Sequence, residues 1–467
     1  MKYIQIILLL LISCQLNLKA QKASREFGKV GRYAMEYKNT TGEKDTEAVV
    51  LFDKGKSYFI ITDKGFEIVY ERTTRIKILT EAGIKWAEIS IPFYQEGSIY
   101  ENIYDLKAYT YNVDKNKLSK TELKTNTCHI EKINNSWNSK KFAMPEVKVG
   151  SIIDYKYKIR SPYLYNLRDW TFQWKIPVEH SEYIVILTPF YSYQWVLQGA
   201  NKFDSYKEEQ CHNLQREIST VKFNDKKTKY VMNNVPAFTD EKYITSMDDY
   251  VIKLDFQLSK ITRLNGVSKN IGTTWEELIK DFLKNKNFGK FIKKSSKKAK
   301  KILNLEEIKN KTEKERLNFI VDYVKRNYSW NRQSRKYASK SVNQLIKDKK
   351  GNASDLNLFT IGLLQASGID AKAILSSTRG NGMIYKKYPF NHYFNNVVIL
   401  AKVDGKLILT DSTEPLISNY RLPVICLNDK GLIISKGKVE WIDLKSNHTT
   451  ETSTKLTLNI KEGLYGI

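Results

Sequence analysis

The chain has 467 residues, which is more than one typical core holds, so we expect two or three domains. Hydrophobic residues make up 41% and aromatic residues 12%, which excludes a chain that is disordered throughout. Lys and Arg outnumber Asp and Glu by 77 to 51, and this net charge of +26 either attracts polyanions and acidic surfaces or reflects a general lysine bias.

The N-terminus has the pattern of an export signal. Lys2 precedes the apolar run YIQIILLLLIS, which has the length of a secretory h-region and is too short to span a bilayer. We predict that residues 1–20 are a signal peptide cleaved after Ala20. Lipidation at Cys14 is the alternative, because the residues before this cysteine resemble a lipoprotein box. Either route predicts an exported protein, soluble or lipid-tethered.

Three cysteines remain downstream of this signal: Cys128, Cys211 and Cys426. An odd number in an exported chain leaves at least one free thiol, and a Cys128–Cys211 disulfide is allowed. Cys128 and Cys211 are each followed by a histidine, but neighbouring residues of a strand point to opposite faces and chelate poorly. We therefore predict no metal site, and we predict no cofactor either.

Residues 45–260 have the pattern of β-strands. The stretch KSYFIITDKGFEIVYERTTRIKILTEAG alternates apolar and polar residues, with turn signals at Asp63-Lys64-Gly65 and Glu81-Ala82-Gly83. Many short strands separated by such turns are typical of a β-sandwich. We therefore predict an all-β sandwich domain over residues 21–265.

The pattern becomes helical near residue 270. Thr274 with Glu277, and Thr312 with Glu315, have the spacing of capping boxes. Apolar residues follow the second box at helical intervals, which predicts a helix there.

Nine lysines and no acidic residue lie between Lys284 and Lys301. This segment is either the solvated face of a helix with a linker or a surface for anionic lipid or another polyanion, and we do not expect nucleic acid as the partner. The lysines that would make such a surface lie in the middle of the segment: Lys293, Lys294, Lys297 and Lys298.

A glycine-led loop, residues 351–355, precedes a predicted buried helix, Leu356 to Gln365, which ends at a glycine in the C′ position. Downstream strand patterns surround Asp404-Gly405, a strong hairpin signal. Helices followed by an antiparallel sheet predict an α+β domain with a buried helix against the sheet, over residues 266–436. Residues 437–467 have the pattern of a further β segment.

Three positions of this domain follow the order that a thiol hydrolase or acyl transferase uses. The N-terminus of the buried helix would stabilise a thiolate through the helix dipole and free N–H groups. His392, expected at the start of a strand, would take the proton, and Asp411, at the end of the next strand, would orient the imidazole. The residue at the nucleophile position is Ala353, whose methyl group cannot attack an acyl group.

The second domain resembles a transglutaminase-like domain of the papain-like cysteine-enzyme superfamily. The residues that carry this resemblance are YVKRNYSW, GNASDLNLFTIGLLQASGIDAKAIL, FNHYFNNVVIL and LTDSTEP. The first domain resembles the β-rich domain of unknown function that often precedes it in exported proteins of Gram-negative bacteria. There the carrying residues are FAMPEVKVGSIIDYKYKIRSP and WTFQWKIPVEHSEY.

The resemblance assigns the nucleophile to Ala353, the general base to His392 and the orienting acid to Asp411, with Trp330 and Asn391 at a candidate cleft. The chain keeps the family's pattern of glycine, polar residue, cysteine, any residue and aspartate except for the cysteine. The resemblance therefore implies the fold and a catalytically inactive binding or scaffold module. It would act in the periplasm or at the outer membrane on a peptide, a protein or a cell-envelope polymer.

Two alternatives stay open. Ser354 could replace the cysteine in an enzyme acting on peptide amide bonds, although its side chain points in another direction and serine needs stronger activation. The lysine segment from Lys284 to Lys301 could instead be the functional element, docking on a polyanion or an anionic membrane.

Overall fold

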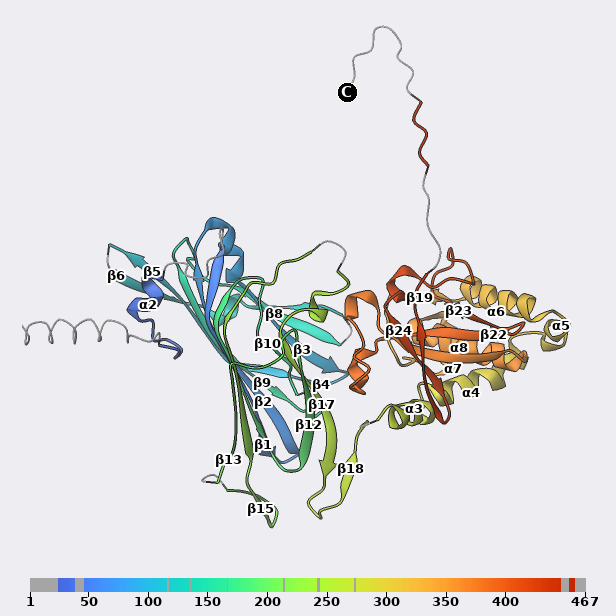
Figure 1. Cartoon of the computed structure of the whole chain (residues 1–467), viewed down its shortest axis with the longest axis horizontal. Helices are drawn as coiled ribbons and strands as arrows, with labels where there is room; N and C mark the ends of the chain where they lie inside the picture. The colour runs from blue at the N-terminus through green and yellow to red at the C-terminus, as the bar shows by residue number, and fades with distance from the viewer. Residues whose placement is uncertain are drawn as a thin grey trace, which may run out of the picture. The chain divides into compact units, whose positions relative to one another are not determined.

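The computed structural model divides the chain into two compact units, Met1–Thr273 and Thr274–Ile467 (Figure 1). It describes residues 24–37, 46–115, 117–134, 136–165, 167–212, 215–241, 244–272, 274–446 and 453–457. The predicted signal peptide, with Cys14 and Ala20, lies outside these ranges. Within them, no helix has the length and apolar character needed to cross a membrane.

The first unit is built mainly from β-strands. Its largest sheet uses β1 (Ala48–Thr62), β2 (Gly65–Ile78), β5 (Asn102–Asp114), β6 (Lys117–Glu122), β9 (Ile152–Ser161), β11 (Val178–Leu187), β13 (Ser205–Gln210) and β16 (Lys226–Val235). In the described part of the chain these eight strands follow the order β13-β16-β11-β1-β2-β9-β5-β6. Neighbouring strands are antiparallel except β1 and β11, which are parallel.

Smaller sheets pack against this large sheet. One contains β3 (Glu88–Glu96), β4 (Ile99–Tyr100), β7 (His129–Lys132) and β8 (Trp137–Ala143), and another contains β10 (Trp170–Thr171), β12 (Tyr191–Gln198), β17 (Lys253–Thr262) and β18 (Ser268–Asn270). The short elements are α2 (Arg32–Met35), η1 (Glu81–Ala87), η2 (Thr125–Thr127), η3 (Met247–Asp249) and the hairpin β14 (Arg216–Ile218) with β15 (Val221–Phe223).

One hydrophobic core joins these sheets. Alternate residues of β2, such as Ile68 and Tyr70, enter the core together with Ile89 of β3 and Leu254 of β17. This alternation is the periodicity of the sequence, because successive side chains of a strand point to opposite faces. The predicted strand-rich first domain is therefore confirmed.

The second unit combines helices with a sheet. Its helices are α3 (Trp275–Lys284), α4 (Gly289–Lys298), α5 (Leu305–Lys309), α6 (Glu313–Asn327), α7 (Val342–Asp348) and α8 (Ala353–Ala366). Its strands are β19 (Ser329–Trp330), β20 (Lys350–Gly351), β21 (Asp370–Ser376), β22 (Asn396–Val403), β23 (Lys406–Thr410), β24 (Lys430–Ser435) and β25 (Lys438–Asp443). Single 3-10 turns complete it: η4 (Ala299–Lys301), η5 (Arg379–Asn381), η6 (Asn391–Tyr393) and η7 (Val424–Cys426).

Helix α8 lies at the centre of the second unit. It packs against α4, α6, β21 and β22 (Figure 1). Its residues from Ala353 to Leu364 are buried. At Gly362 an added Cβ would lie 2.4 Å from the Cβ of Ser295, so glycine lets α4 approach closely. The predicted buried helix against an antiparallel sheet is confirmed, but the helix begins at Ala353 rather than Leu356, because Asn352 caps it.

The hairpin and cap signals are also present. Asp404 and Gly405 both have positive φ, 49° and 78°, between paired strands β22 and β23. Thr312 forms the predicted capping box with Glu315. The hydroxyl of Thr274 accepts a hydrogen bond from the backbone N–H three residues on, so α3 begins where the sequence predicted.

One predicted boundary is wrong. Strand β25 pairs with β24 and completes the sheet β23-β22-β21-β24-β25, so it does not begin a further domain. Trp441 of β25 packs against Trp275 at 5.0 Å and Phe394 at 6.5 Å between ring centroids, which holds the strand to this unit. Most of the remaining residues of segment 437–467 lie outside the described ranges.

Candidate functional site

The candidate site is built at the N-terminus of α8. Asn352 Oδ1 accepts from the Asp355 N–H at 2.8 Å, and Asp355 Oδ2 accepts from the Asn352 N–H at 2.9 Å. Ala353 is the first residue of the helix, is 2% exposed, and donates its N–H to the Gln333 carbonyl at 3.0 Å. The position assigned to a thiol therefore holds a methyl group at the start of a capped, buried helix.

Asp355 and Gly351, which belong to the family pattern, have architectural roles here. The buried Asp355 carboxylate accepts from the Ser339 N–H at 2.9 Å, the Ser339 hydroxyl at 2.6 Å and the Lys340 N–H at 3.2 Å. It thereby ties the loop before α7 to the helix N-terminus. At Gly351 an added Cβ would lie 2.5 Å from the Asp355 Cβ, so a larger residue does not fit. The pattern serves the fold even without a cysteine.

Ser354 is directed into the protein. Its side chain is fully buried, and its hydroxyl donates to the backbone carbonyl of Arg335. A hydroxyl with its proton bound to an internal carbonyl does not face a substrate. The geometry therefore argues against Ser354 as a nucleophile.

Asp411 lies beside α8 and contacts Asn357, which is one helical turn after Ala353. Its Oδ2 accepts from Asn357 Nδ2 at 2.7 Å, and its Oδ1 accepts from the N–H of Thr413 at 2.7 Å and from the hydroxyl of the same residue. Asn357 Oδ1 in turn accepts from the Ser412 N–H at 2.8 Å. Burial raises the pKa of Asp411, while the hydrogen bonds from Thr413 and Asn357 oppose this shift.

His392 is not placed as predicted. It lies in the 3-10 turn η6 and is exposed, whereas strand β22 begins only at Asn396. Its ring packs on Phe390 and Tyr393, at centroid distances of 5.3 and 4.9 Å. The prediction of a strand start at His392 was wrong because these aromatic contacts hold the segment in a turn.

The other predicted cleft residues have different positions. Trp330 Nε1 donates to the Gln333 carbonyl at 3.0 Å, the same oxygen that accepts the Ala353 N–H. Trp330 therefore belongs to the surroundings of the helix N-terminus. The carbonyl of Asn391 accepts from Lys336 Nζ at 2.7 Å, and burial lowers the pKa of Lys336 to about 8.

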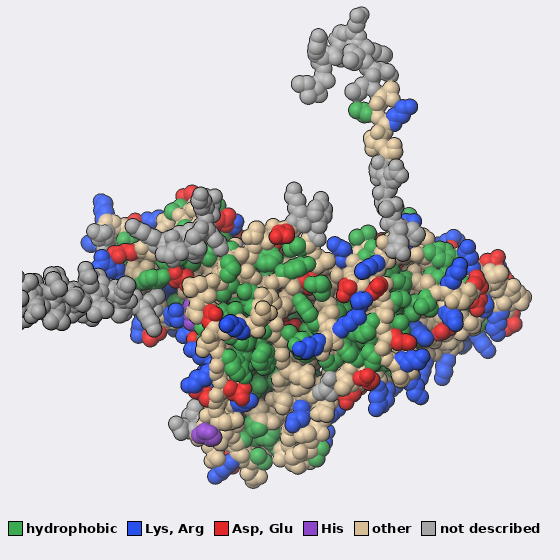
Figure 2. Space-filling view, viewed as in Figure 1, with side chains coloured by type: hydrophobic (Ala, Val, Ile, Leu, Met, Phe, Trp, Pro, Cys, Tyr) green, Lys and Arg blue, Asp and Glu red, His purple; other side chains and the backbone are tan. Residues whose placement is uncertain are grey.

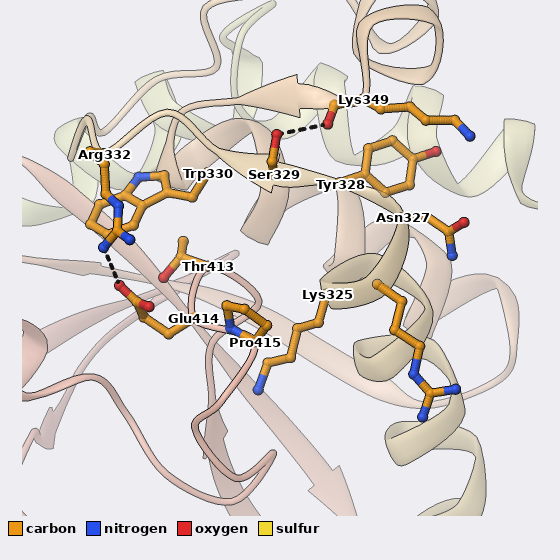
Figure 3. A pocket seen from close by; sticks show the side chains of 11 residues that line it. Lys325, Asn327, Tyr328, Ser329, Trp330, Arg332, Lys349, Thr413, Glu414 and Pro415 are labelled. Carbon is orange, nitrogen blue, oxygen red and sulfur yellow. Dashed lines mark hydrogen bonds and ion pairs between the residues drawn. The ribbon is translucent and has the colours of Figure 1, made fainter.

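A cavity of about 360 Å³ lies beside Trp330. Figure 3 shows its wall from Tyr328 to Trp330 facing the loop that carries Thr413, Glu414 and Pro415. The residues that line this cavity include one acidic residue, Glu414, and four cationic ones: Lys325, Arg326, Arg332 and Lys349. The cavity thus combines aromatic surface with an excess of positive charge, which favours an anionic ligand.

Two known families match the chain. A domain of unknown function with solved structure, DUF3857, matches residues 66–237, and the transglutaminase-like superfamily matches residues 304–405. The chain carries a DUF3857 domain followed by a transglutaminase-like domain.

Solved structures resemble this two-domain chain. A candidate protease from Parabacteroides distasonis shares 14% identity with a TM-score of 0.56, over 85% of this chain and 72% of that chain. At this identity the likeness shows a common fold. A candidate cysteine protease from Cytophaga hutchinsonii shares 13% identity with a TM-score of 0.21, over 78% of this chain and 92% of that one. No curated protein is significantly similar.

The lysine segment of the transglutaminase-like domain runs from the last residue of α3 through α4 and η4. Lys293, Lys294 and Lys297 are exposed and Lys298 is half-buried, while Phe291 on the same helix is buried. Figure 2 shows Lys and Arg side chains along the edge where Figure 1 places α4. The segment is thus a solvated face of an amphipathic helix, and its binding to a polyanion stays a prediction.

The cysteines of both domains are free thiols. Cys128 and Cys211 are half-buried and do not form the disulfide that the sequence allowed. Cys426 is buried, and burial raises the pKa of its thiol, which disfavours the thiolate. In the ranges that the structure describes, no three His, Cys, Asp or Glu side chains gather as a metal site requires.

Proposed function

We propose that the transglutaminase-like domain is a non-catalytic binding module. The observation that carries this proposal is Ala353, which occupies the first position of α8 and offers no nucleophilic atom. The surrounding architecture is complete, since Asn352 and Asp355 cap the helix and Trp330 is tied to the same carbonyl as Ala353. A site of this kind keeps its surface for recognition without the group that would attack an acyl carbon.

The neighbouring side chains support the same conclusion. Ser354 is buried and bonded to a backbone carbonyl, and Asp411 bonds to Asn357 and Thr413. A triad needs a base within hydrogen-bond reach of both nucleophile and acid. The described contacts of Ser354 and Asp411 tie both residues into the structure of the domain.

The cavity beside Trp330 favours an acidic peptide as the ligand. Its aromatic wall can contact apolar side chains of a peptide, and the cations around it can pair with carboxylates. Lys349 lines this cavity and is exposed, and its ammonium group has no ion pair among the described residues. We further propose that this binding takes place outside the cytoplasm at the cell envelope, following the export signal predicted for residues 1–20.

The experiment that tests this proposal measures turnover. Purified wild-type protein is incubated with fluorogenic peptide amides and with an acyl-transfer pair, using papain as the positive control, beside a Ser354→Ala variant. We expect no turnover above buffer from either form. Clear wild-type turnover that Ser354→Ala abolishes would establish the alternative enzyme and overturn the proposal.

Binding is tested by fluorescence anisotropy with an acidic peptide and its amidated, uncharged counterpart. We expect the acidic form to bind more tightly and Lys349→Asn to weaken it, because asparagine tolerates the left-handed backbone at this position (φ 50°) but carries no charge. Lys347→Asn on the exposed side of α7 is the matched control and should bind as wild type.

A further inference from the structure

The DUF3857 domain contains two adjoining cavities that the transglutaminase-like site does not use. Their volumes are about 400 and 560 Å³, and both are lined by Trp86, Glu88 and Lys175. The first is also lined by Trp174, and the second by Phe238. The shared lining makes one extended, aromatic groove, which we call the Trp86 groove.

Both indole rings of the groove are fixed in orientation. Trp86 Nε1 donates to Glu47 Oε2 at 3.4 Å, and Trp174 Nε1 donates to Asp53 Oδ2 at 3.2 Å. The two rings lie 6.2 Å apart with an interplanar angle of 46°, and both are half-buried. Because each N–H is already bonded within the protein, the groove presents ring faces rather than indole donors.

Arg72 holds this arrangement in place. Its guanidinium makes two hydrogen bonds to Asp53, at 2.9 and 2.6 Å, and lies over the rings of Trp170 and Trp174 at 4.9 and 5.3 Å from their centroids. The groove is therefore preorganised, which lowers the entropic cost of binding a ligand.

The charges around the groove are largely paired. Arg72 is neutralised by Asp53, Lys85 pairs with Glu47 at 2.6 Å, and Lys175 pairs with Asp240. With these cations paired and the carboxylate of Glu88 also in the lining, the groove lacks the positive field that would select a polyanion or an acidic peptide. In the polar lining, Ser90 bonds to Ser139, and Gln173 bonds to the Pro236 carbonyl and the Ile252 N–H. The hydroxyl of Thr171 and the exposed carboxylate of Glu88 offer hydrogen bonds to an uncharged polar ligand.

We propose that the Trp86 groove binds a neutral oligosaccharide. The C–H faces of sugar rings stack on Trp86 and Trp174, and the sugar hydroxyls bond to the polar lining and to Glu88. Aromatic grooves also bind proline-rich peptides. Such peptides need donors for their carbonyls, and both indole N–H groups here are already occupied. The two cavities in succession fit a chain of sugars rather than one ring.

The test uses the full chain and a panel of neutral oligosaccharides: cellohexaose, xylohexaose, mannohexaose, maltohexaose and chitohexaose. Binding is followed by tryptophan fluorescence and calorimetry at about 50 mM and about 500 mM NaCl. We expect at least one member to bind with the same affinity at both salt concentrations. Failure of every member to bind, or a steep loss of affinity with salt, would overturn the proposal.

Two variants locate the binding. Trp86→Leu should weaken it by about tenfold or more, which corresponds to the loss of one stacked ring. Trp195→Leu is the matched control, since Trp195 is 40% exposed on β12, lies outside the groove and should leave affinity unchanged. Thermal unfolding confirms that both variants are folded, and Glu88→Gln, which preserves packing, provides a second variant with weakened binding.

A proline-rich peptide is tested in parallel. If it binds and Trp86→Leu abolishes that binding while no oligosaccharide binds, the groove is a peptide site and the proposal is wrong.

Discussion

Asn357 donates its side-chain amide to Asp411 across 2.7 Å inside the second unit, and both residues are buried. The same amide group donates to the Val397 carbonyl at 2.8 Å and accepts from the Ser412 N–H at 2.8 Å. The acid that the resemblance assigned to catalysis is therefore part of a network joining α8 to the sheet. Ala353 lies one turn earlier on the same helix.

Replacing Asn357 by leucine should destabilise the protein. Asp411 would keep its bonds to Thr413 but lose a donor in a buried site, which costs about 2–4 kcal/mol in the free energy of unfolding. Urea denaturation followed by circular dichroism measures this. Asn327→Leu, at an exposed position of α6, is the control and should change stability by about 0.5 kcal/mol or less. Equal effects of the two substitutions would contradict the role of the network.

Gly351→Ala should also lower stability. The new Cβ would lie 2.5 Å from the Asp355 Cβ, and relieving this contact costs about 1–3 kcal/mol. Gly380→Ala is the matched control, because nothing lies within 4 Å of a Cβ there. A shift in thermal midpoint for Gly351→Ala alone is expected. If Gly351→Ala melts like wild type, glycine is not needed for packing at this position.

Lys336 should make stability depend on alkaline pH. Burial lowers its pKa from 10.5 to about 8 in the folded protein. Below this pH both states carry the charge and the burial cost is present in full; between about pH 8 and 10.5 the unfolded state binds more protons, so stability rises with pH. Between about pH 8 and 10.5, the free energy of unfolding of the wild type should therefore rise relative to that of Lys336→Met. The exposed Lys347→Met should show no such trend.

Ala353→Cys should not create an enzyme. A thiol there would lie at a helix N-terminus, but Asp411 is bonded to Asn357 and Thr413 and His392 packs on aromatic rings in η6. We expect the variant to show no peptide amidase activity above wild type. Restoration of turnover by this single change, lost again in a second His392→Ala change, would show that the base is in reach.

Local signals predicted much of this architecture. The alternation in β2, the cap at Thr312 and the Asp404–Gly405 turn depend on neighbours in sequence, and each formed as expected. Strand β25 was misassigned because its pairing with β24 and the contact of Trp441 with Trp275 are non-local.

The candidate site was harder to predict. His392 was misplaced because FNHYFNN has no clear strand period, and its ring packs on its sequence neighbours Phe390 and Tyr393 within a turn. Asn357 was missed, although a lone amide in the apolar run LNLFTIGLL is a signal, since a buried polar group requires partners. The resemblance placed Gly351 and Asp355 in the family's pattern, and their packing and hydrogen bonds explain them as parts of the fold.

The central claim is that the transglutaminase-like domain recognises a ligand without transforming it. The most direct measurement incubates the wild-type chain with an acidic peptide, records the bound fraction, and determines the mass of the peptide recovered from the complex. The account predicts a peptide that is bound in a Lys349-dependent manner and recovered intact. Recovery of a hydrolysed, deamidated or cross-linked peptide would contradict it.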